Sequence, residues 1–304
     1  MISRNQLDET MFETLKLAAT RMPPDIRNAL EEVLRREKNT LSRKHMEVTL
    51  ENARLASEGK GLVCGDTGFP LFFITAGSGV QIEGGYNTLW EAARTATERA
   101  TKEGYLRPTM VDPLTRENPG TNTGMEMPRV QLRFDGPADL LDIVAAPKGG
   151  GSEIFGTFYR MLYPSDGRPG IFKFVIDSIR EGCYAGKICP PAIVGVGIGG
   201  TADLCMIMAK RAALLRPVGT SNPHADLQEI EERLLLASRS LGIGPMGSRG
   251  EFAVLAVHVE RAATHTAALP VAVNAQCSIG RRWRALIREG KKTEYTGNFG
   301  AAVN

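Results

Sequence analysis

Three cysteines stand where an apolar, strand-like run meets a turn. Cys64 opens CGDTG before the run LFFITAG, Cys189 precedes two prolines and the run AIVGVGI, and Cys277 follows the run LPVAVNAQ. A thiol at such a junction can be a buried bystander, a nucleophile or a metal ligand. The intervals of 125 residues (64 to 189) and 88 residues (189 to 277) lack the close cysteine pairs of zinc ribbons and ferredoxins. A shared metal site would therefore have to be assembled by the fold.

A run of glycines is the second feature that could do chemistry. Gly149, Gly150 and Gly151 follow the strand-like LLDIVAA. With no side chains in the way, their backbone N–H groups can converge on one anion. The turn therefore suits a carboxylate or a phosphate.

Another glycine-rich stretch superficially matches a dinucleotide fingerprint. Gly195, Gly197 and Gly200 give G-x-G-x-x-G, but the pattern begins inside the strand-like AIVGVGI and lacks a suitable acidic residue about 20 positions later. We therefore expect no nicotinamide site here. The helix that follows can still hold an anion at its N-terminus.

These stretches occur in one chain together with several others. CGDTG, KGGGSE, CPPAIVGVGIGGTAD, LLRPVGTSNPH, LGIGPMG and THTAALPVAVNAQC resemble the alpha subunit, or N-terminal domain, of the iron–sulfur class I fumarate hydratases and L-tartrate dehydratases. The resemblance covers most of residues 50–283. It implies a [4Fe–4S] cluster held by Cys64, Cys189 and Cys277. Cys183 and Cys205 match no ligand position, and Cys205 is expected in the core.

The resemblance also implies a reaction, the reversible hydration of a four-carbon dicarboxylate such as fumarate to malate. Three thiolates leave one of the four irons without a protein ligand, so that iron can act as a Lewis acid toward a substrate hydroxyl. Asp66 matches a position beside the cluster that moves a proton or orients the hydroxyl, although its side chain could instead cap the turn. Thr67 is expected to contact the substrate with it.

Further positions carry over in the same way. Arg107 matches a position that reaches a substrate carboxylate, which a guanidinium can bind through two hydrogen bonds. Gly149, Gly150 and Gly151 would offer N–H groups to the same dianion. His224 matches a histidine near the substrate, whereas His265 could equally be a core histidine.

Two departures leave the substrate open. The family commonly has glutamine where this chain has Gly65, and KGGGSE is closer to the fumarase branch while SEIFG departs from the usual continuation. Tartrate or another hydroxy diacid is therefore an alternative substrate. A non-catalytic iron–sulfur sensor or assembly subunit, or zinc held by histidine and cysteine, are alternatives of another class.

A partner chain is expected as well. The second half of the family, which supplies further cationic anchors and a threonine, is missing from these 304 residues. We therefore expect a separate beta subunit, in a hetero-oligomer or an alpha-chain dimer.

The elements that must position these residues indicate a mixed α/β fold. Residues 6–59 show helical spacing, and the strand-like runs LFFITAG, VQLRFDG and LLDIVAAP then alternate with helical stretches. We expect an N-terminal helical segment over 1–50, a cluster-binding catalytic domain over 51–290 and a tail over 291–304 that is frayed or adds a strand to a neighbour. The polar stretch 107–128 is expected to be a functional loop, and RRWRALIREGKK (281–292) a solvated helical face.

Composition sets the remaining bounds. Thirty-seven basic and 34 acidic residues give a net charge of +3, too small to indicate a nucleic-acid partner. No signal peptide and no apolar run of about 18 residues is present, which argues against a membrane protein. Five cysteines, an odd number, indicate reduced thiols and a cytoplasmic protein.

Overall fold

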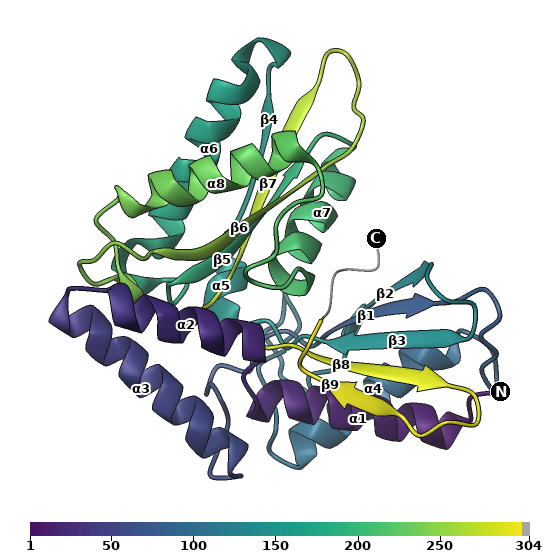
Figure 1. Cartoon of the computed structure of the whole chain (residues 1–304). Coiled ribbons are helices and arrows are strands. Elements are labelled where there is room, and N and C mark those ends of the chain that lie inside the picture. Colours follow the sequence, from purple (N-terminus) through teal and green to yellow (C-terminus); the bar gives the residue numbers. More distant parts are fainter. Residues whose placement is uncertain (300–304) are drawn as a thin grey trace. The chain divides into compact units, whose positions relative to one another are not determined.

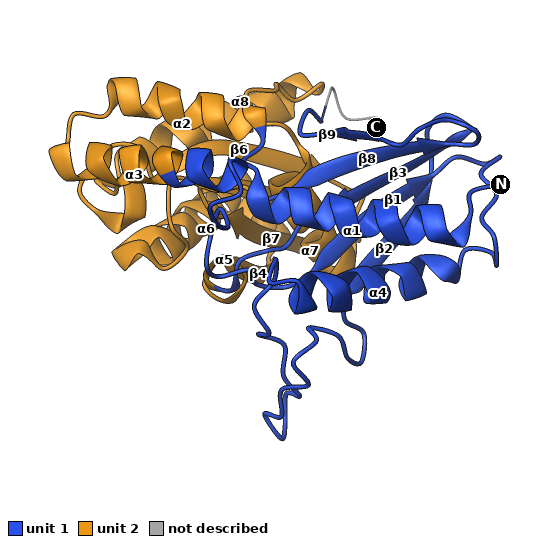
Figure 2. Ribbon diagram, turned by 90° about the horizontal axis from the view of Figure 1, so that it is seen from below, with its two compact units in different colours: residues 1–23, 52–150, 281–304 blue, residues 24–51, 151–280 orange. Residues whose placement is uncertain are grey.

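The computed structural model describes residues 1–299, which form two compact units (Figure 2). Unit 1 contains residues 1–23, 52–150 and the segment from 281 onward, and unit 2 contains residues 24–51 and 151–280. Each unit has its own sheet and helices, so the expected mixed α/β class is confirmed. The functional division at residues 50 and 290 stays a prediction.

Unit 1 is built on a five-stranded sheet of order β2-β1-β3-β8-β9 (Figure 1). β1 and β2 are parallel, and the other neighbours are antiparallel. Two helices pack on one face. The elements are α1 (Arg4–Thr20), β1 (Leu71–Ala76), α4 (Thr88–Lys102), β2 (Arg129–Phe134), β3 (Leu140–Ala145), β8 (Trp283–Arg288) and β9 (Glu294–Thr296).

Alternation along the strands decides which face of this sheet is covered. Phe72, Ile74 and Ala76 of β1 point to one side and join the core that contains α1 and α4. On α1, Met11 and Leu15 recur at a spacing of four, so they meet the same core. Burying a large apolar side chain contributes about 1.5–3 kcal/mol. This core therefore holds the sheet whose end carries the candidate site.

Unit 2 has a four-stranded sheet of order β4-β7-β5-β6. β5 runs antiparallel to β7 and parallel to β6. The elements are α2 (Pro24–Arg36), α3 (Thr40–Ser57, whose last residues belong to unit 1), α5 (Gly150–Ile154), β4 (Thr157–Leu162), α6 (Gly167–Cys183), β5 (Ala192–Ile198), α7 (Ala202–Leu215), α8 (Ala225–Arg239), β6 (Val254–Arg261) and β7 (Leu269–Gln276).

The glycines of the dinucleotide-like pattern serve packing in unit 2. A Cβ at Gly195 would lie 2.0 Å from the backbone oxygen of Ala209, and one at Gly197 would lie 2.1 Å from that of Cys205, both on α7. The alternate residues Val194 and Val196 join the core that contains α6 and α8. Helices thus cover both faces of β5, and glycine is required because α7 approaches the strand backbone closely.

The predicted helical face over 281–292 is wrong. Trp283–Arg288 forms β8, between β3 and β9. Buried Ala285 and Ile287 alternate with half-buried neighbours, which is the period of a strand. The run is not solvated at its start either, because Arg281 and Arg282 are only 1% and 0% exposed.

The other expectations about elements hold, except that a function for the stretch 107–128 stays a prediction. The N-terminal helical layer is confirmed by α1, α2 and α3. β9 pairs with β8, so the tail does add a strand to a neighbour, and residues 300–304 of that tail lie outside the described residues. The stretch 107–128 is irregular and is held by Asn122, whose Oδ1 accepts hydrogen bonds from the N–H groups of Thr109 and Met110. Over residues 1–299, every helix is too short or too polar to cross a membrane.

Candidate active site

One end of the unit 1 sheet gathers three segments that are far apart in the sequence. The β1–β3 ladder continues to Phe69 and Lys148, which exchange two backbone hydrogen bonds of 2.7 and 2.9 Å. Trp283, the first residue of β8, pairs with Ala145 at the same end. The CGDTG turn before β1, the glycine turn after β3 and the arginines before β8 therefore meet at this end.

The aspartate of CGDTG lies against the glycine turn. A Cβ at Gly150 would lie 3.3 Å from Asp66 Oδ2 and 3.5 Å from Asp66 Oδ1. Gly68, at φ +66°, passes so close to the other segment that its Cβ would lie 1.8 Å from the backbone oxygen of Lys148. Only glycine fits that approach, and it brings the carboxylate of Asp66 next to backbone groups that suit an anion.

Arg107 is tied to the same turn. Thr67 Oγ1 accepts a hydrogen bond of 2.9 Å from the Arg107 N–H, and Arg107 Nη1 donates to the Gly65 oxygen at 3.2 Å. Thr67 is buried, whereas Asp66 and Arg107 are exposed. Thr67 thus positions the arginine backbone and leaves the guanidinium at the surface.

In unit 2, the antiparallel pairing of β5 and β7 brings two cysteine-bearing turns together. Cys189 precedes β5 and Cys277 follows β7, and Ile193 pairs with Gln276 where these ends meet. The N–H of Ser278 donates to the Cys189 oxygen at 3.1 Å. Cys189 has φ +52°, a left-handed conformation that is costly for a residue other than glycine. Such strain often accompanies a functional residue.

The two remaining cysteines have the surroundings of core residues, which was the expectation for Cys205. Cys183 and Cys205 are 0% exposed, and burial raises the pKa of the Cys183 thiol to about 12 and that of Cys205 to about 11. Their thiolates, the form that binds metal, are therefore disfavoured. All five thiols are free of disulfides.

The expected site residues fall into two groups. Unit 1 brings together Cys64, Asp66, Thr67, Arg107, Gly149 and Gly150, and unit 2 carries Gly151, Cys189, His224 and Cys277. Gly151 lies beside the loop that leads to Cys189, because its Cβ would be 2.7 Å from the Lys187 oxygen. Within residues 1–299, no three His, Cys, Asp or Glu side chains are grouped to hold one metal ion. The roles of all these residues stay predictions.

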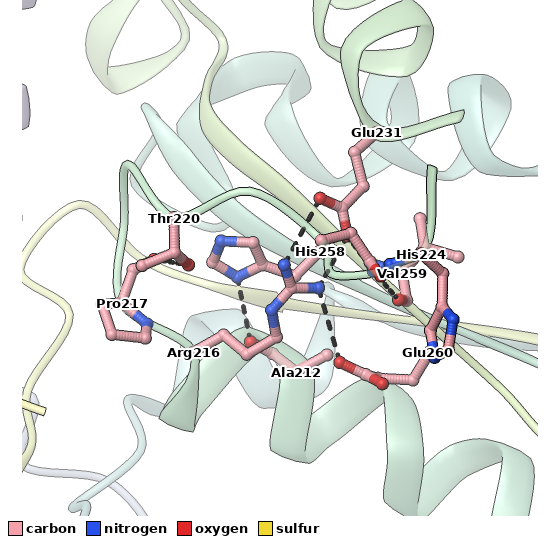
Figure 3. A network of polar contacts seen from close by, with 10 residues as sticks. Ala212, Arg216, Pro217, Thr220, His224, Glu231, His258, Val259 and Glu260 are labelled. Atoms are coloured by element: carbon pink, nitrogen blue, oxygen red, sulfur yellow. Dashed lines mark hydrogen bonds and ion pairs between the residues drawn. The ribbon is translucent and has the colours of Figure 1, made fainter. Parts of the chain in front are cut away.

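His224 is the N-cap residue of α8 and lies beside a partly buried ionic network (Figure 3). Its N–H donates to Asn222 Oδ1 at 3.0 Å, and Asn222 in turn donates to Glu231 Oε1 at 2.9 Å. The guanidinium of Arg216 pairs with Glu231 at 2.6 Å and with Glu260 at 3.4 Å. Burial raises the pKa of the Glu260 carboxyl, and Arg216 opposes that rise. The network holds the loop between α7 and α8, which carries His224.

The other histidines differ from one another. His258 is buried and its Nδ1 lies 3.1 Å from the Ala212 oxygen, so a packing role suffices, as expected. The core alternative for His265 is wrong because that residue is exposed. Its Nδ1 accepts a hydrogen bond from the Ala267 N–H at 3.1 Å.

Glu231→Ala is expected to destabilise the protein strongly. Glu231 Oε1 accepts from Arg216, Asn222 and the Val259 N–H, and its side chain is only 8% exposed. Removing the carboxylate leaves the Arg216 guanidinium, only 11% exposed, with the longer pair to the partly exposed Glu260, and it removes the acceptor of the Val259 N–H, which together cost about 3–5 kcal/mol. Urea unfolding measures the decrease in the free energy of unfolding of each variant. Glu229→Ala, on the same helix, is the control: its pairs with Arg168 and Arg233 are exposed, and each contributes at most about 1 kcal/mol. Equal losses for the two variants would contradict the prediction.

The sequence interpretation missed buried cations at the unit 1 sheet end. Lys148, Arg281 and Arg282 are each at most 1% exposed. Lysine next to a glycine run and a pair of arginines before an alternating run were visible in the sequence. Their burial was not, because the run 281–292 was interpreted as a solvated helix.

Comparison with known proteins gives this arrangement its context. Residues 8–285 match the family described as Fumarate hydratase (Fumerase). The chain belongs to the fumarate hydratase family. It is therefore a hydro-lyase, as the resemblance implied.

Two relatives of this chain in the fumarate hydratase family are named as alpha subunits of L(+)-tartrate dehydratase. It is 39% identical over 278 residues to "Putative L(+)-tartrate dehydratase subunit alpha" of Methanocaldococcus jannaschii, covering 91% of this chain and 96% of that protein. It is 32% identical over 283 residues to L(+)-tartrate dehydratase subunit alpha of Escherichia coli (strain K12), covering 93% of this chain and 91% of that one.

Proposed function

We propose that this chain is the alpha subunit of a two-subunit hydro-lyase acting on a four-carbon dicarboxylate. The observation that carries the proposal is the meeting of the Cys189 and Cys277 turns at one end of the β5–β7 pair, in a chain of the fumarate hydratase family. The names of its relatives, which are alpha subunits, support a beta partner for this chain.

The cofactor in the proposal is a [4Fe–4S] cluster held by Cys64, Cys189 and Cys277. The donor set fits, because three thiols at turn positions, none of them in a disulfide, can each bind one iron as thiolates. The strained backbone of Cys189 fits as well, since the surrounding structure holds that thiol in a costly conformation. Cysteines outside disulfides suit a reducing compartment, and we include a cytoplasmic location in the proposal.

When bound, such a cluster supplies an iron without a protein ligand that polarises the bond between a substrate carbon and its hydroxyl. Residues of the chain bind the substrate carboxylate and move the proton. Arg107, exposed at the CGDTG turn, binds one carboxylate through its guanidinium. The N–H groups of Gly149 and Gly150 support that anion. Asp66, against Gly150, orients the hydroxyl or moves the proton at the adjacent carbon, and His224 is a second candidate for that transfer.

Two substrates fit this arrangement. Fumarate and L-malate follow from the family, and L-tartrate follows from the names of the relatives. Both reactions break or form a bond between carbon and a hydroxyl oxygen next to a carboxylate, so the same residues serve either one.

The proposal is tested by loading the chain with iron and sulfide under anaerobic conditions and adding the beta chain. Fumarate, L-malate, L-tartrate and D-tartrate are offered in parallel, and formation or loss of the double bond is followed by absorbance. Turnover of one of these diacids is the expected result. A chain that binds a cluster yet turns over none of them would be a sensor or assembly subunit. One zinc per chain without sulfide would exclude the cluster.

A further inference from the structure

Arg281 is a buried cation for which residues 1–299 supply no hydrogen-bond acceptor. Its side chain is 1% exposed, and none of its three guanidinium nitrogens has a hydrogen-bond partner in the described part of the chain. Arg282 differs, because its guanidinium lies 4.5 Å from the centre of the Phe299 ring. Lys148 has a partner too.

Burying a charged guanidinium without a hydrogen-bond acceptor is costly in free energy. Taking an ion out of water without a partner costs several kcal/mol. Arginine cannot avoid that cost by losing its proton, because it stays charged at any physiological pH. The buried acids of residues 1–299, Glu37 and Glu231, have partners of their own: Glu37 accepts from the Asn39 and Glu251 N–H groups, and Glu231 accepts from Arg216. Arg281 thus has the environment of a residue whose anion is supplied from outside the polypeptide.

The position of Arg281 narrows the choice of anion. It stands just before β8 at the unit 1 sheet end, where the CGDTG turn with Cys64 precedes β1. It also follows Cys277 by four residues, and the Gly280 N–H donates to the Cys277 oxygen at 3.0 Å, which closes the turn between them. A chain advances at most about 3.6 Å per residue, so the two Cα atoms lie within about 14 Å of each other.

We propose that Arg281 is a positioning residue for the iron–sulfur cluster, whose thiolate and sulfide charge its guanidinium offsets. This inference rests on the proposed function. A cofactor that stays in place once it is bound can be the partner of a fully buried side chain. A substrate that binds and leaves in every turnover needs an exposed partner such as Arg107. Charge and hydrogen bonds near the sulfurs of such clusters set their reduction potential, so Arg281 holds the cluster and raises that potential.

The test compares wild type, Arg281→Met and Arg281→Lys, with and without anaerobically loaded cluster. The control is Arg288→Met, on β8, whose partner is the exposed Asp139 at 3.3 Å. In the cluster-free chain, Arg281→Met is expected to raise the thermal midpoint, since it removes an uncompensated charge. In the loaded chain it is expected to lower the midpoint, shift the reduction potential to a more negative value and weaken iron retention against a chelator roughly 10- to 100-fold.

Arg281→Lys keeps the charge, so its potential is expected to stay near that of wild type, with iron retention between the other two. The Arg288→Met control is expected to leave the potential and iron retention unchanged. Three results would overturn the inference. One is an equal loss of stability in loaded and cluster-free Arg281→Met, which would mean a purely structural role. Another is unchanged potential and retention with a raised KM for the diacid, which would make Arg281 a substrate anchor. If Arg281→Met does not fold, retention equal to wild type in Arg281→Lys also overturns it. Failure of wild type to take up a cluster would refute the proposed function itself.

Discussion

Serine at any one of Cys64, Cys189 and Cys277 is expected to reduce the iron bound per chain to background. Each thiolate would hold a different iron, so no remaining ligand can replace the lost one. Alanine at Cys183 or Cys205 is expected to leave iron near the wild-type level. Iron and acid-labile sulfide per chain, measured after anaerobic loading, decide between these outcomes.

The two alanine variants are matched controls for this series. Cys183 and Cys205 are buried, with pKa values raised to about 12 and about 11, so they are poor thiolate ligands. Circular dichroism of all five variants separates loss of the ligand from loss of the fold. An equal fall in iron across the five would contradict the assignment of Cys64, Cys189 and Cys277.

The cluster-loaded chain alone is expected to have at most about one hundredth of the activity it shows with the beta chain. A diacid carries two carboxylates, whereas Arg107 is one exposed guanidinium, and Arg281 and Arg282 are buried. A hydrogen bond to a charged group contributes about 1.5–3 kcal/mol. Two missing ones therefore lower kcat/KM by roughly a hundredfold or more.

The measurement is kcat/KM for the diacid at rising concentrations of added beta chain, at constant cluster content. Activity should saturate as the complex forms. Arg107→Lys in the full complex is the companion variant, because lysine keeps the charge but cannot form the two parallel hydrogen bonds of a guanidinium. It should raise KM without changing iron content. Full activity of the alpha chain by itself would refute the prediction that the substrate site needs the beta chain.

Much of the fold could be predicted from periodicity. Spacing of three and four gave the helices of the first 59 residues, and short apolar runs gave β1, β2, β3, β5 and β7. β8 was mispredicted because three of its six residues are charged or aromatic. Such residues can lie at the surface of a helix as well as at the surface of a strand. Only pairing with β3 and β9 selects the strand.

The candidate site shows the same division. The sequence by itself determined which residues stand at turns: three cysteines at strand junctions, an aspartate in CGDTG and a run of glycines. It could not determine which turns meet, because that depends on pairing between strands separated by long stretches of chain. The antiparallel pairing of β5 and β7 brought the turns of Cys189 and Cys277 together. The antiparallel pairing of β1 and β3 placed Asp66 against Gly150. Burial is likewise a property of the packed units, so only the tertiary structure decided that Arg281 is a buried charge whose guanidinium has no hydrogen-bond partner among the described residues.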